Sequence, residues 1–159
     1  AWTDGKSVMF TPEIMDFLET DKELATVIAH ELSHNVMGHH SKKTVNGILG
    51  TVLDIAAATQ GINTGGLMGS IGVQSFSQGF ENEADYVAIY ILALAGYDIS
   101  NVHQLWRKMT IQTGTGTKSS FFSSHPSNPE RFIRMQRAIE EVKAKQKAGQ
   151  KLEPNYKSA

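Results

Sequence analysis

The chain has 159 residues, of which 40% are hydrophobic, enough apolar material for one buried core and one domain. Its 15 basic and 16 acidic residues give a formal net charge of -1, so bulk charge offers no reason to expect nucleic acid or an anionic membrane as a partner. The chain contains no cysteine, which excludes disulfides, thiolate metal ligands and cysteine nucleophiles, and any metal must be bound by His, Asp or Glu.

The first forty residues predict a strand and two helices. A turn at Asp4-Gly5 precedes a short strand over residues 6–10, and Thr11-Pro12 suits the start of a helix with proline at its first position. The segment from Thr20 to Glu23 has the form of a capping box, in which the two side chains satisfy free amides of the first turn. A helix is therefore predicted from Asp21 to about Gly38.

The middle of the chain predicts a helix followed by a loop. A second helix is expected over residues 43–60, and its apolar part, residues 45–58, is shorter than the roughly 20 residues of a membrane span. We expect this part to be buried or adjacent to a membrane. Residues 61–79 then contain six glycines, and because glycine loses much backbone entropy on ordering, a mobile loop or lid is predicted there.

The rest of the chain predicts three more helices. One covers residues 80–95 and ends at Gly96, the next runs from Ser100 to about residue 113, and the last begins at Asn128-Pro129. A polar loop is expected over residues 114–124, and residues 148–159 are expected to be a disordered tail. The predicted fold is mainly α with a small β element.

The strongest motif is His30-Glu31-Leu32-Ser33-His34, a known pattern of zinc proteases. Four residues advance a helix by about 400°, so both imidazoles project from nearly the same side and can bind one cation. Glu31 is rotated by about 100°, where it can reach a metal-bound water without being a ligand. The chain's own His and Glu frequencies predict about 0.014 such patterns by chance, so a solvated pair of histidines is the weaker interpretation.

A third ligand is needed, because catalytic zinc sites normally have three protein ligands and water. Glu81 is the candidate, and Asp85 lies one helical turn later, where its carboxylate can orient a ligand imidazole. This spacing is weak when taken alone, because an exposed acidic helix face has the same pattern.

Together these motifs resemble the gluzincins, and more closely the HtpX, BepA and CAAX prenyl endopeptidase family, which is peptidase family M48. The segments after the second motif agree, including Ala95-Gly-Tyr-Asp98 and His125-Pro126 with Arg131. The resemblance implies a zincin-like α+β catalytic domain over residues 1–147, lacking an N-terminal part that relatives usually have. It also implies that Glu81 is the third ligand of one zinc ion, that Asp85 supports a ligand, and that residues 45–79 resemble the family's glycine-rich or membrane-contacting insert.

The resemblance also places His125 near the metal. It is expected to donate a hydrogen bond to the oxyanion formed during hydrolysis, and the alternative is a fourth zinc ligand that holds the enzyme inactive. A loop histidine with neither role is the remaining interpretation. His39 and His40 are expected to be surface residues or cations near a helix end.

The implied activity is zinc-dependent endopeptidase chemistry on misfolded or membrane-associated polypeptides, in quality control of a bacterial cell envelope, with no nucleic acid partner. One alternative is a metzincin, in which His40 is the third ligand, although that pattern needs glycine at position 37, where this chain has Met37. The other is a protease-like chaperone or adaptor that binds unfolded clients, against which the intact Glu31 argues. Oligomeric state and natural substrate are not indicated by the sequence.

Overall fold

A computed structural model describes residues 1–65, 67–114, 125 and 129–155; within these, the side chains of residues 40, 43–50, 53, 67–77 and 113–114 are not described. The fold is mostly helical with a two-stranded sheet, as predicted. In chain order, the elements are β1 (Trp2–Thr3), β2 (Val8–Met9), α1 (Pro12–Phe17), α2 (Asp21–Val36), α3 (His39–Thr59), α4 (Leu67–Leu94), α5 (Gln104–Gly114) and α7 (Pro129–Lys147).

The N-terminal elements begin where their sequence signals lie. β1 and β2 form an antiparallel hairpin in which Thr3 pairs with Val8. The side chain of Thr11 caps α1, and that of Thr20 caps α2 by accepting a hydrogen bond from the Glu23 amide at 3.1 Å. Glu23 in turn accepts a hydrogen bond from the backbone amide of Glu19. The predicted capping box therefore forms, but the amide bound by Glu23 lies one residue before the N-cap residue Thr20.

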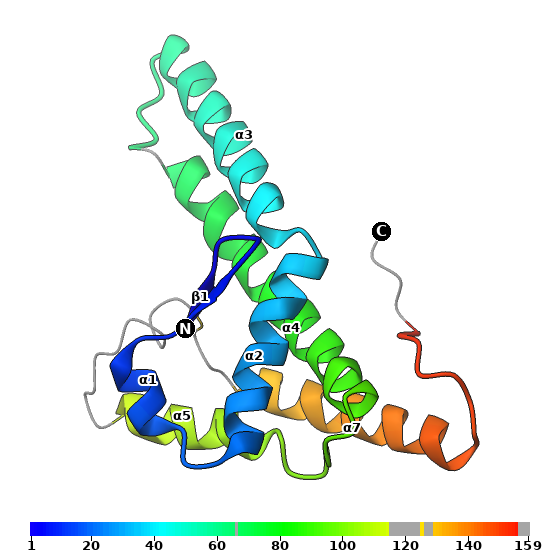
Figure 1. The fold of residues 1–159 in the computed structure, drawn as a ribbon. Helices are drawn as coiled ribbons and strands as arrows, with labels where there is room; N and C mark the ends of the chain where they lie inside the picture. Colours follow the sequence, from blue (N-terminus) through cyan, green and yellow to red (C-terminus); the bar gives the residue numbers. More distant parts are fainter. Residues whose placement is uncertain (66, 115–124, 126–128, 156–159) are drawn as a thin grey trace.

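The prediction of a glycine-rich loop is wrong for residues 67–79, which form the first half of α4. Gly69, Gly72 and Gly79 lie inside this helix, where each glycine costs about 1 kcal/mol relative to alanine. Helical stability in proteins comes mainly from tertiary packing, and α4 runs alongside α3, which offsets that cost. The two helices form a long pair that projects from the rest of the molecule (Figure 1). No lid is therefore assigned to residues 67–79.

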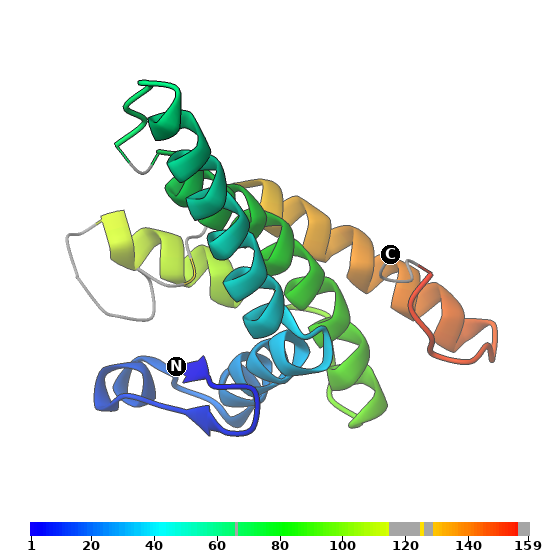
Figure 2. The ribbon, with the colours of Figure 1, turned by 90° about the horizontal axis from the view of Figure 1, so that it is seen from above.

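The core lies where α2, the second half of α4, α5 and α7 meet. Figure 2 shows the N-terminal hairpin and α1 on one side of α2 and α4, with α7 on the other. The core side chains include Val27, Ala88, Ile89, Leu92, Leu105, Met109, Met135, Ile139 and Val142. Packing of α2 against α4 places the two sequence motifs face to face.

Two other regions refine the sequence predictions. The C-terminal half of α4 ends at Leu94, and Gly96 follows with a φ of +82°, as expected of a C-terminal glycine cap. The described part of the tail, residues 148–155, forms no helix or strand, but Leu152 packs against the core and the Asn155 amide donates a hydrogen bond to Tyr86 Oη. The polar loop predicted over residues 114–124 lies outside the described residues from position 115 onward, as do Asn128 and residues 156–159.

No helix in the described part of the chain combines the length and apolar character needed to cross a bilayer. The segment predicted to be buried or adjacent to a membrane forms most of α3, and Val52 and Ile55 on it are more than half exposed. These described side chains of α3 are therefore not core residues.

Candidate active site

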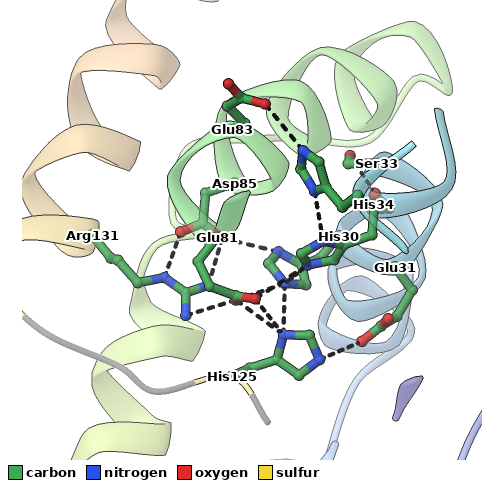
Figure 3. Close-up of polar contacts among 11 residues, drawn as sticks. His30, Glu31, Ser33, His34, Glu81, Glu83, Asp85, His125 and Arg131 are labelled. Atoms are coloured by element: carbon green, nitrogen blue, oxygen red, sulfur yellow. Dashed lines mark hydrogen bonds and ion pairs between the residues drawn. The ribbon is translucent and has the colours of Figure 1, made fainter. Parts of the chain in front are cut away.

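Helices α2 and α4 bring the sequence motifs into one buried cluster. His30 and His34 extend from one side of α2 toward Glu81 on α4, and His125 closes the group (Figure 3). One ligand atom from each of these four residues lies within 4.8 Å of all the others. The structure therefore assembles the three residues predicted to bind metal, although they are separated by up to 51 positions in the chain.

The donor atoms lie close to the spacing that a tetrahedral cation requires. The Nε2 atoms of His30 and His34 lie 3.1 Å apart, and their distances to the Glu81 carboxylate oxygens are 3.2 and 3.3 Å. Ligands about 2.0 to 2.2 Å from a tetrahedral zinc ion are separated by about 3.3 to 3.6 Å. The nitrogen and oxygen donors would thus need to move apart by only a few tenths of an ångström to bind a metal. Two neutral imidazoles and one carboxylate are the protein ligands of known catalytic zinc sites.

His125 lies at the remaining corner of this cluster. Its Nδ1 is 3.2 Å from His30 Nε2 and 3.0 Å from Glu81 Oε2, while its Nε2 is 3.2 Å from Glu31 Oε1. The imidazole therefore stands between the donor set and the carboxylate predicted to be the general base. His125 thus offers a fourth atom that could hold a metal ion together with those of His30, His34 and Glu81.

Glu31 is buried next to the cluster without belonging to it. Burial would raise the pKa of its carboxyl group, but the hydrogen bond and charge of His125, with smaller contributions from His30 and His34, hold that pKa below its ordinary value. The group is therefore an anion near neutral pH, which is the protonation state that a general base needs.

The two imidazoles have opposite pKa shifts. Burial would lower the pKa of His30, but the hydrogen bonds and charges of Asp85 and Glu81 outweigh it and raise that pKa to about 9. For His34, burial dominates over the hydrogen bond to Glu81 and lowers the pKa to about 4. Binding of a metal to His30 would therefore displace a proton near neutral pH.

Asp85 lies beside His30, where the prediction placed a carboxylate that can orient a ligand imidazole. Asp85 Oδ1 lies 3.0 Å from His30 Nδ1, the ring nitrogen that faces away from the cluster. Arg131, on α7, donates hydrogen bonds of 2.7 and 2.9 Å to the two oxygens of Asp85, and its Nη1 lies 3.1 Å from Glu81 Oε2. Burial would raise the pKa of Asp85, but the Arg131 guanidinium holds it below its usual value.

No role for Arg131 was predicted from the sequence. Its side chain is only 2% exposed and contacts both Glu81, the third candidate ligand, and Asp85, which lies beside His30. No local pattern marks it, because its partners lie 46 and 50 positions earlier in the chain. The only sequence signal for this region was the resemblance of His125-Pro126 and Arg131 to the C-terminal segment of family M48.

His39 is not the surface residue that was predicted. It is 1% exposed, because α2 ends at Val36 and Gly38 turns the chain, with φ +64°, so that α3 begins with His39 against the cluster. Burial lowers the pKa of His39, with Glu83 acting in the opposite direction. The side chain of His40, the ligand of the metzincin alternative, lies outside the described residues, although its backbone belongs to α3.

Comparisons with known proteins agree with this geometry. The sequence model of peptidase family M48 matches residues 1–139. The chain is 34% identical over 127 residues to metalloprotease LoiP of Escherichia coli, covering 74% of this chain and 49% of that protein. It is 30% identical over 132 residues to mitochondrial metalloendopeptidase OMA1 of Arabidopsis thaliana, covering 80% of this chain and 26% of that protein.

A third relative is the β-barrel assembly-enhancing protease of Yersinia pestis, 30% identical over 124 residues that cover 69% of this chain and 25% of that protein. The chain therefore spans between a quarter and a half of the length of these relatives. No solved structure matches it. The match over residues 1–139, with the assembled His and Glu cluster, places the chain in peptidase family M48, the metallopeptidase family that the sequence resembled, and not among the metzincins.

Proposed function

We propose that this domain is a zinc-dependent endopeptidase that holds one zinc ion with His30, His34 and Glu81. The observation that carries the proposal is the convergence of their buried donor atoms, with spacings of 3.1 to 3.3 Å, beside an ionised Glu31. When bound, zinc would supply a Lewis acid that polarises the scissile carbonyl and lowers the pKa of water toward about 7.

Glu31 is the proposed general base. Its carboxylate takes a proton from the attacking water as the new C–O bond forms at the peptide carbonyl. The protonated carboxyl then gives that proton to the leaving nitrogen as the C–N bond breaks. The products are a carboxylic acid and an amine, and no covalent bond to the protein is formed.

His125 has two candidate roles. The position of its Nδ1, 3.0 Å from Glu81 Oε2, supports a fourth ligand in the conformation described. The oxyanion donor, which the sequence argument favoured, requires the ring to leave this corner when substrate binds. His125→Ala separates the two, because loss of a donor lowers turnover by about 10²-fold to 10³-fold, whereas loss of a blocking ligand raises it.

The substrate is proposed to be a polypeptide that lies in extended form beside β2. The β1–β2 hairpin packs against α2, and the Thr3 hydroxyl donates a hydrogen bond of 2.6 Å to Asn35 Oδ1, one residue after His34. A strand added to this hairpin would gain main-chain hydrogen bonds next to the helix that carries the base.

The biological role is proposed to be protein quality control at a membrane, with misfolded or membrane-associated polypeptides as substrates. Two relatives are named for mitochondria and for β-barrel assembly, which supports a membrane-linked setting, and the bacterial relatives favour a cell envelope. Val52, Ile55 and Ile62 are 55%, 61% and 60% exposed on or next to α3, which supports contact of this helix with a membrane surface.

The test compares the parent protein with Glu31→Gln on an unfolded substrate protein, with cleavage followed by mass spectrometry and zinc by elemental analysis. We expect about one zinc per chain in both proteins, and cleavage only in the parent, abolished by a chelator and restored by zinc. A parent that binds no zinc overturns the metal assignment. Substrate binding without cleavage in both proteins indicates the chaperone or adaptor instead.

A further inference from the structure

The second ring nitrogen of His34 faces another buried histidine. His34 Nδ1 lies 2.8 Å from Nδ1 of His39, whose Nε2 lies 3.0 Å from Glu83 Oε2. The His39 ring also stacks on Phe80, with 4.4 Å between ring centroids and an angle of 17° between the planes. Three contacts on different sides therefore determine the orientation of one imidazole.

Protons can be placed in this row of groups in only one consistent way if His34 offers Nε2 to a metal. Nε2 is the nitrogen that faces His30 and Glu81, so a neutral His34 ring carries its proton on Nδ1. That proton needs an acceptor, which is Nδ1 of His39, and His39 then carries its own proton on Nε2. The carboxylate of Glu83 accepts it, and the row ends on a group that only accepts.

The arrangement parallels the support of the other imidazole. His30 faces the carboxylate of Asp85 directly, at 3.0 Å. Glu83 lies two residues after Glu81 on α4, a rotation of about 200°, and so it cannot reach the same cluster by itself. His39 spans that gap, and each candidate histidine ligand thereby receives a carboxylate from the same helix.

We propose that His39, held by Glu83 and Phe80, is a positioning residue that fixes His34 with its proton on Nδ1 and its Nε2 directed at the metal. This rests on the proposed function, because it takes His34 as a ligand. Ligand histidines usually donate their second ring N–H to a partner, and loss of such a partner typically lowers metal affinity by about 10-fold to 100-fold.

Two substitutions of the same residue test the proposal. In His39→Asn the side-chain amide oxygen can occupy the place of Nδ1 and accept from His34. In His39→Gln the amide reaches the place of Nε2, near Glu83, and leaves the His34 proton without its acceptor. His103→Gln is the matched control, because His103 is also buried, at 7% exposed, but packs on Phe132 away from the cluster.

Zinc affinity is measured by competition with a chromogenic chelator, and the tautomer of His34 by nitrogen-15 NMR of the metal-free proteins. We expect His39→Gln to bind zinc about 10-fold to 100-fold more weakly than the parent and to lose the uniform Nδ1–H form of His34. His39→Asn should restore most of the affinity, and His103→Gln should match the parent.

Two results overturn the proposal: a His39→Gln protein that keeps parental affinity and the Nδ1–H tautomer, or folded His39→Asn and His39→Gln proteins that are weakened equally. If His39→Gln does not fold, the same measurements are made on Glu83→Ala, because the Glu83 side chain is 45% exposed and its removal disturbs the core less. The expected loss of zinc affinity is then smaller. A parent that binds no zinc refutes the proposed function, whereas a zinc-binding parent with an insensitive His39 refutes only this inference.

Discussion

Replacing Arg131 with Met tests how the buried charges of the site are balanced. Its guanidinium makes contacts of 2.7, 2.9 and 3.1 Å with Asp85 and Glu81, and all three residues are at most 2% exposed. Met fills much of the same volume but leaves both carboxylates without this cation. Removing one partner of a buried ion pair typically costs about 3 to 5 kcal/mol, mainly because the remaining charge is buried and unpaired.

The loss should depend on the metal. In the metal-free protein, His30 is the one other cation among the described residues in contact with both carboxylates, at 3.0 Å from Asp85 and 3.2 Å from Glu81. Bound zinc would place positive charge next to Glu81 and compensate part of the loss. We therefore expect Arg131→Met to lower the free energy of unfolding by about 3 to 5 kcal/mol without metal, and by less with zinc.

Urea unfolding, followed by circular dichroism with chelator and with zinc, measures both values. Arg134→Met is the matched control on the same helix, because Arg134 is 55% exposed and pairs with the exposed Glu130, so its loss should be below about 1 kcal/mol. Arg131→Lys should fall between the two, since it keeps the charge but not the paired hydrogen bonds. Equal losses for Arg131→Met and Arg134→Met would refute the charge argument.

Three further predictions concern the same molecule. Asp85→Asn should weaken zinc binding by about 10-fold to 100-fold in a chelator competition assay, and unchanged affinity would mean that the 3.0 Å contact does not orient His30. The pKa of His30 is raised from 6.5 to about 9 in the folded protein. Its contribution to the stability of the metal-free protein is therefore present below pH 6.5 and lost as the pH rises through 9. At pH 9, His34 is neutral in both the folded and the unfolded protein. The expected loss, on the order of 3 kcal/mol, is measured by urea unfolding at pH 6.5 and 9 as the difference between the parent and His30→Asn, which cancels the opposite effect of the lowered pKa values of the Ala1 amino group and of His34. Gly96→Ala should lower the melting temperature, because it places a side chain at a φ of +82° at a cost of about 1 to 2 kcal/mol. Gly79→Ala inside α4 should raise the melting temperature, because alanine is the better helix former and its Cβ meets no other atom within 4 Å. Shifts of the same sign in the two variants would contradict this backbone argument.

Local signals in the sequence were sufficient for several features of this protein. The capped start of α2 after Thr20, the start of α1 at Pro12 and the end of α4 before Gly96 all follow from interactions within a few residues. The convergence of His30 and His34 is likewise local, because helical geometry alone places residues four apart on one side. The membership in family M48 is likewise a property of the sequence, since the family's sequence model matches residues 1–139.

Tertiary structure decided the features that depend on distant partners. The first half of α4 is helical despite its glycines, because packing along α3 outweighs a weak local preference. His39 is buried since the turn at Gly38 directs it to His34, and Arg131 reaches Asp85 from a helix that begins 44 residues later. The sequence by itself determined the capped helix ends and the placement of His30 and His34 on one side of α2, because both follow from short-range geometry. The contacts of His39 and Arg131 with this cluster became evident only in the fold, because they join residues that no local sequence pattern brings together.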